Sequence, residues 1–69
     1  MHRDLYESLL ASIEAENWQG LWHDSFFLDA GDGEKLRRQM SYEYADDSAA
    51  PNCPPSVLVG IVNRLYTGV

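Results

Sequence analysis

The start of the chain shows a helical pattern of apolar and polar positions. At about 100° per residue, a side chain returns to the same side of a helix every three or four positions. Asp4, Glu7 and Glu14 then lie opposite the apolar stripe, with the two earlier acids in the first turn, where the helix dipole favours negative charge. We predict a helix over residues 3–16, with apolar face Leu5, Tyr6, Leu9, Leu10 and Ile13.

The next stretch changes to a period of two. Apolar and polar side chains alternate through residues 34–44, which is typical of a strand with one buried face and one exposed face. The segment 17–20 closes the first helix, because Gly20 is free to adopt a positive φ. Residues 22–30 then form the partner strand, around a turn at residues 31–33.

The register of this hairpin follows from its loop. A three-residue loop places Leu28 opposite Leu36 and Asp29 opposite Lys35, which joins apolar to apolar and acid to base. A two-residue loop would place Leu28 opposite Arg37 and scatter the apolar face. The sequence therefore favours the three-residue loop.

The end of the chain contains a second apolar stripe, after a loop over residues 46–55. Pro55 is suited to the first position of a helix, and Ser56 is a candidate cap. Residues 57–62 are rich in β-branched side chains and fit a buried strand too, but the stripe continues as far as Tyr66, which favours a helix. Its members are Val57, Leu58, Ile61, Val62, Leu65 and Tyr66.

These elements predict an α+β fold. Residues 1–69 form a single domain with the order α-β-β-α, in which two helices cover the apolar face of an antiparallel hairpin. The sequence also allows a short third strand around residues 17–21. A chain of this length can bury only one core, and it folds with a small margin of stability.

Charge narrows the partners that we expect. Eleven carboxylates against five cations give a formal net charge of −6. Such a charge repels nucleic acids and anionic membranes and attracts basic protein surfaces. We expect no direct binding of nucleic acid or membrane. With one cysteine, no charged-then-apolar leader and no long apolar run, the sequence predicts a cytoplasmic protein.

No catalytic or metal-binding motif stands out. The acidic turn that begins at Asp29 fails the calcium-loop pattern, because Gly31 and Gly33 occupy positions that need oxygen ligands. His2, His23 and Cys53 lack the spacing of a zinc pair, and nothing marks Cys53 and His23 as nucleophile and base. We therefore expect no cofactor, no metal and no enzymatic activity.

The acidic residues fall into three groups whose spacing suggests a row of phosphates. Phosphates of one DNA strand repeat about every 3.4 Å along the axis, and Asp4 and Glu7 are about 4.5 Å apart along a helix. A basic groove that binds DNA would accept such a surface. The predicted partner-binding residues are Asp4, Glu7, Glu14, Asp29, Asp32, Glu34, Glu43, Asp46 and Asp47.

In its brevity, acidity and lack of catalytic residues, the chain resembles small phage-encoded anti-CRISPR proteins of the DNA-mimic type. The resemblance covers the whole chain and concerns character, because these inhibitors share no motif. It implies an inhibitor that binds a basic DNA-binding protein or a CRISPR effector complex in the host cytoplasm and blocks its DNA site. Lys35, Arg37 and Arg38 beside the predicted turn depart from a uniformly acidic surface.

The alternative hypothesis is a small interaction or regulatory module. It would bind through exposed aromatic side chains, with Trp18, Trp22 and Tyr44 as candidates, because exposed aromatics are enriched at binding hot spots. Such a protein would be a monomer or a weak homodimer. Salt separates the hypotheses, since binding by charge weakens with ionic strength and binding by aromatic side chains does not.

Overall fold

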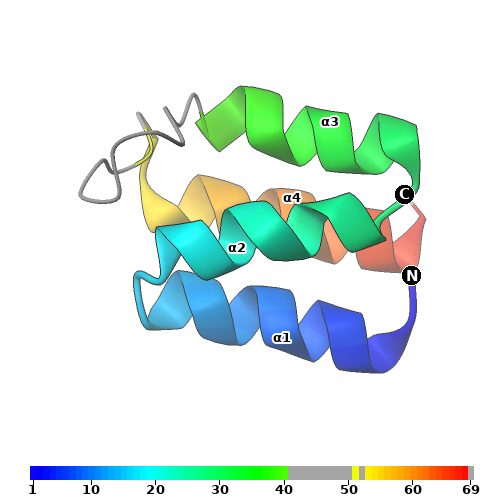
Figure 1. Ribbon diagram of the computed structural model, residues 1–69, viewed down its shortest axis with the longest axis horizontal. Coiled ribbons are helices and arrows are strands. Elements are labelled where there is room, and N and C mark those ends of the chain that lie inside the picture. Colours follow the sequence, from blue (N-terminus) through cyan, green and yellow to red (C-terminus); the bar gives the residue numbers. More distant parts are fainter. Residues whose placement is uncertain (41–50, 52, 69) are drawn as a thin grey trace.

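The computed structural model describes residues 1–40, 51 and 53–68, and these residues form an all-helical domain. The helices are α1 (Arg3–Glu14), α2 (Trp18–Asp24), α3 (Ala30–Met40) and α4 (Pro55–Thr67), and a short 3-10 helix, η1 (Ser25–Phe27), follows α2 directly (Figure 1). The first and last helices confirm the two helices that the sequence predicts. The α+β class is wrong, because the described residues contain no strand.

The predicted hairpin is replaced by α2, η1 and α3. Its turn at residues 31–33 lies inside α3, and the pairing of Leu28 with Leu36 and of Asp29 with Lys35 does not occur. The third strand around residues 17–21 is wrong too, because α2 covers most of it. Leu36 and Met40 are four residues apart, so the same positions that fit a strand also share one face of a helix, and both are fully buried.

The first helix ends differently from the prediction. Glu16, and not Gly20, adopts the positive φ, at 55°. Asn17 then caps α2, since its side-chain oxygen accepts a hydrogen bond from the backbone N–H of Gly20 at 3.1 Å. At the start of α4, Pro55 occupies the first turn as expected, but Pro54 is the cap residue and Ser56 lies within the helix.

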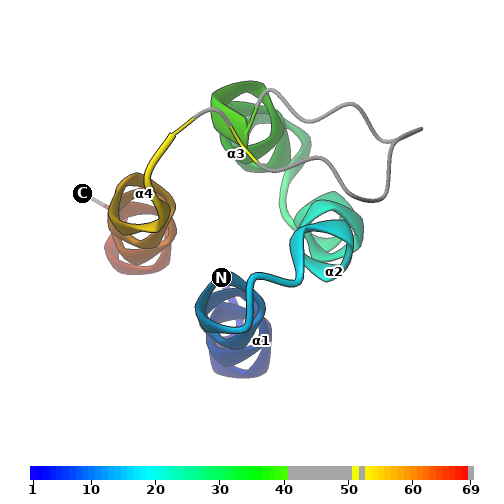
Figure 2. The ribbon, with the colours of Figure 1, turned by 90° about the vertical axis from the view of Figure 1, so that its left-hand side faces the viewer.

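The four helices pack as an antiparallel bundle. Seen from one end they occupy the corners of a square, with α1 diagonally opposite α3 and α2 diagonally opposite α4 (Figure 2). Helices α1 and α3 run in one direction and α2 and α4 in the other, so α1 and α3 begin at the same end of the bundle (Figure 1). The core between them consists of Leu9, Ile13, Leu21, Leu36, Met40, Leu58 and Val62.

Helix α3 packs against η1 through a close backbone contact. A Cβ added at Gly33 would lie far inside van der Waals distance of the carbonyl oxygen of Ser25, so a residue without a side chain is required there. Ser25 itself is fully buried. Its hydroxyl donates to the carbonyl of Trp22 at 2.5 Å and accepts from Arg37 at 2.9 Å, which satisfies this buried polar group.

Helix α1 packs against α4 through aromatic side chains near the surface. The rings of Tyr6 and Tyr66 are stacked, with centroids 4.0 Å apart and an interplanar angle of 13°. The Tyr6 hydroxyl also donates to the side-chain oxygen of Asn63 on α4. Within the described residues, no helix has both the length and the apolar character needed to cross a membrane.

Candidate functional site

Charge is divided unequally between the two halves of the bundle. Residues 1–29, here called the α1–α2 half, contain six carboxylates and one arginine, a formal charge of −5. The described residues from Ala30 onward, the α3–α4 half, contain two carboxylates and four cations, a formal charge of +2. Among the described residues, negative charge is therefore concentrated in the α1–α2 half; the remaining three carboxylates, Glu43, Asp46 and Asp47, lie outside them.

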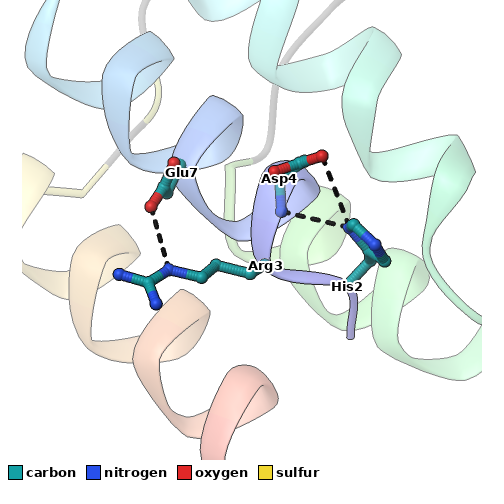
Figure 3. Close-up of polar contacts among 4 residues, drawn as sticks. All are labelled: His2, Arg3, Asp4 and Glu7. Carbon is teal, nitrogen blue, oxygen red and sulfur yellow. Dashed lines mark hydrogen bonds and ion pairs between the residues drawn. The ribbon is translucent and has the colours of Figure 1, made fainter.

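The solvent face of α1 carries the first group of predicted acidic residues. Asp4, Glu7 and Glu14 are all exposed on this helix, as expected for residues on the side opposite its apolar stripe. Figure 3 shows the contacts of the first two. Arg3 Nε donates to Glu7 Oε1 at 3.1 Å, and both side chains are well exposed, so this pair partly neutralises Glu7 and adds little stability.

Asp4 lies beside a histidine that caps α1. The backbone N–H of Asp4 donates to His2 Nδ1 at 3.2 Å, and an Asp4 carboxylate oxygen lies 3.8 Å from the same nitrogen (Figure 3). A ring nitrogen that accepts a hydrogen bond carries no proton, so the cap and an ion pair exclude each other. In the capped arrangement, the Asp4 carboxylate keeps its negative charge without compensation from His2.

The second group of predicted acidic residues lies where the two halves join, with Asp29 as the last residue of the α1–α2 half and Asp32 and Glu34 in α3. Asp29 and Glu34 are exposed and Asp32 is partly buried. Arg38 forms an ion pair with Glu34, one turn along the same helix. The three cations Lys35, Arg37 and Arg38 of this helix offset the three carboxylates in formal charge, so the start of α3 is locally neutral.

The fold therefore separates most of the predicted row. The α1 group and the α3 group belong to helices at opposite corners of the bundle (Figure 2), although both helices begin at the same end. The third group, Glu43, Asp46 and Asp47, lies outside the described residues. Among the described residues of the predicted row, Asp4, Glu7 and Glu14 form one acidic surface, the solvent face of α1.

An exposed aromatic pair on η1 was missed by the sequence analysis. Phe26 is 61% exposed and Phe27 is 76% exposed, the largest exposed fractions among the large hydrophobic side chains of the described residues. The Phe26 ring contacts Trp22 in a T-shaped arrangement, with centroids 6.2 Å apart, and the guanidinium of Arg37 lies 4.0 Å from the centre of the Phe26 ring. The signal was two adjacent phenylalanines, because only one of two neighbours can face the core of a regular strand.

The aromatic residues that the sequence suggested are placed differently. Trp18 and Trp22 are half-buried and pack against the core, and Tyr44 lies outside the described residues. Large amphipathic rings commonly take such positions in small domains. Among the described residues, the most exposed aromatic side chains are thus the two phenylalanines.

The candidate metal ligands and nucleophile remain dispersed. Among residues 1–40, 51 and 53–68, no three His, Cys, Asp or Glu side chains are grouped to hold a metal ion. Cys53 is half-buried, and its Sγ lies 3.7 Å from the carbonyl oxygen of Gln39 at the end of α3. The Cys53 thiol thus donates to a backbone carbonyl at the end of α3, and the candidate base, His23, lies on α2.

Comparisons with known proteins add no assignment. The sequence matches no protein-family model, and neither the curated proteins nor the solved structures yield a significant match. Function must therefore be argued from the charges and exposed side chains of the domain itself.

Proposed function

We propose that this domain is a non-enzymatic inhibitor that binds a basic, nucleic-acid-processing protein through the acidic face of α1. The observation that supports the proposal is the concentration of negative charge in the α1–α2 half, with Asp4, Glu7 and Glu14 exposed along one helix. A CRISPR effector complex is the partner that the resemblance implies. The inhibitor would act in the cytoplasm, where such a complex meets DNA.

The mechanism is competition for a cationic site. Lysine and arginine side chains that contact DNA phosphates would contact the α1 carboxylates instead, and the negative field would accelerate encounter. Such binding should weaken as salt rises, because exposed charges are screened over about 8–10 Å at physiological ionic strength. No chemical step is required of the inhibitor.

The experiment compares two variants with the same net charge. Glu7→Lys with Glu14→Lys reverses the α1 face, and Asp29→Lys with Glu34→Lys makes the same charge change on the α3 side. Tagged wild-type and variant domains are incubated with bacterial lysate, and captured proteins are eluted with short duplex DNA and identified by mass spectrometry. The proposal expects DNA-eluted proteins that the α1 variant loses, by about tenfold or more, and the α3 variant retains.

Other outcomes of this capture contradict the proposal. Equal loss from both variants would show that net charge alone recruits the partner. Retention by the α1 variant, or captured proteins that duplex DNA does not displace, would remove the α1 face as a competitor for DNA. Circular dichroism of each variant checks that the helices remain formed.

A second candidate function is favoured by the exposed phenylalanines. Phe26 is held in place by Trp22 and Arg37, so a partner that covers it would immobilise few additional rotamers. This arrangement suits an interaction module or a weak homodimer that binds through aromatic contacts. Size-exclusion chromatography with light scattering, at low and high salt, should then show a salt-tolerant dimer that Phe27→Ser dissociates; a monomer under all conditions would exclude the homodimer.

A further inference from the structure

The α3–α4 half contains a groove whose chemistry is opposite to that of the α1 face. The groove has a volume of about 650 Å³ and lies between α3 and α4. Among the described residues, its charged lining consists of Lys35, Arg38 and Arg64 against the carboxylate of Asp32, a formal charge of +2. Three of the five cations of an acidic protein thus line one groove.

The apolar lining of the groove follows one face of α4. Val57, Ile61 and Leu65 recur every four residues, and together they extend about 12 Å along the helix axis. Val57 is 37% exposed and the other two are half-buried, so their outer surfaces are open to solvent. An apolar strip of this length, bordered by cations, matches two to three turns of an amphipathic helix.

The cations are positioned to act on a ligand. Lys35 has no ion-pair partner within the part of the chain that the structure describes. Arg64 Nε donates to the carbonyl of Gly60, within its own helix, at 3.4 Å, which orients the guanidinium along α4. Arg38 shares its charge with Glu34. A carboxylate-bearing partner would therefore meet at least two cations that no described acidic side chain neutralises.

From this combination we propose that the α3–α4 groove binds an acidic amphipathic helix of a partner protein. The apolar strip accepts the apolar face of that helix, and Lys35 and Arg64 pair with its flanking carboxylates. Two copies of this domain placed groove to groove would bring like charges together, which disfavours a symmetric dimer through this face. The groove is a second binding site, separate from the α1 face and independent of its proposed role.

The test uses a synthetic peptide. The probe is a capped amphipathic helix of about four turns, with leucine at i, i+3, i+4 and i+7 and glutamate elsewhere. Its binding to the full domain is followed by fluorescence anisotropy and by amide chemical shifts. A peptide with lysine in place of glutamate, a scrambled peptide and a short duplex DNA serve as comparison ligands.

Two protein variants with equal net charge locate the site. Lys35→Gln with Arg64→Gln removes two positive charges from the groove, and Arg3→Glu makes the same change in net charge on α1. The proposal expects the groove variant to weaken peptide binding by about tenfold and Arg3→Glu to change it by less than about twofold. Val57→Asp, at an exposed position of the apolar strip, should weaken binding to a similar degree.

Several outcomes would overturn the groove as a site for an acidic helix. These are no binding of the glutamate peptide, equal binding of the lysine or scrambled peptide, equal weakening by Arg3→Glu, or chemical shift changes confined to α1 and α2. Stronger binding of duplex DNA to the same amides would assign the groove to phosphates instead. None of these results depends on whether the α1 face binds a basic protein.

Discussion

The α1–α2 half and the α3–α4 half are joined along two interfaces that are built differently. Where η1 meets α3, backbone approaches backbone at Gly33, and the buried hydroxyl of Ser25 links Trp22 to Arg37. Where α1 meets α4, stacked tyrosine rings and one hydrogen bond to Asn63 lie close to the surface. The first interface has no room for additional atoms, whereas at the second, water can replace a hydrogen bond that is removed.

This difference matters for function because the described residues of the two halves carry opposite formal charge. Packing must hold the two halves in a fixed orientation, so that the acidic α1 face and the cation-lined α3–α4 groove stay on separate sides of the molecule. The attraction between the halves helps only slightly, since the charges are largely exposed and screened. The close-packed η1–α3 interface is therefore expected to determine stability, and the α1–α4 interface to adjust it.

The largest effect is expected from adding a side chain at the close backbone contact between η1 and α3. Gly33→Ala inserts a methyl group against the carbonyl oxygen of Ser25, so η1 and α3 must move apart. We expect a loss of about 2–3 kcal/mol in the free energy of unfolding, measured by urea denaturation. Gly31→Ala is the matched control in the same helix.

The control should change stability in the opposite direction. A Cβ at Gly31 meets no atom within 4 Å, so alanine there only improves helix propensity. An increase of about 0.5–1 kcal/mol is expected. If both alanine variants gained stability equally, the close contact at Gly33 would not be a feature of the folded protein.

A smaller effect is expected from removing the buried hydroxyl. Ser25→Ala deletes the bond to Trp22 and leaves the guanidinium of Arg37 without its buried acceptor. The free energy of unfolding should fall by about 1–2 kcal/mol in the same denaturation experiment. Ser8→Ala removes an exposed hydrogen bond to Asp24 and should cost less than about 0.5 kcal/mol; similar losses would mean that burial of Ser25 is unimportant.

The smallest effect belongs to the α1–α4 interface. Tyr6→Phe keeps the stacked ring but deletes the hydrogen bond to Asn63, and because water can replace this bond, we expect a loss of about 0.5 kcal/mol. In Tyr66→Phe the ring is also kept, and no hydrogen bond of the Tyr66 hydroxyl is seen within the described residues, so its stability should not change. Thermal unfolding followed by circular dichroism compares the two, and a larger loss for Tyr66→Phe would contradict the contrast between the interfaces.

The candidate site could be predicted only in part. An amphipathic helix places its polar residues on one face by its own periodicity, so the exposure of Asp4, Glu7 and Glu14 followed from spacing. The ion pair of Glu34 with Arg38 could not be predicted from a hairpin. Residues four positions apart in a strand are about 13 Å apart, which is too far for an ion pair, whereas in a helix they are neighbours one turn apart. The exposed Phe26 and Phe27 and the basic groove depend on how helices pack and were missed.

By itself, the sequence determined the terminal helices and the sign of the charge along the chain. Both are local properties: a stripe at three- and four-residue spacing needs no partner to define its apolar face, and a carboxylate stays acidic in any fold. Only the tertiary structure decided the middle of the chain, since Gly33, Leu36 and Met40 fit a hairpin and a helix equally well. Helix forms there because it buries Leu36 and Met40 in the same core as the apolar residues of α1 and α4, and because Gly33 leaves room for η1 to pack against α3.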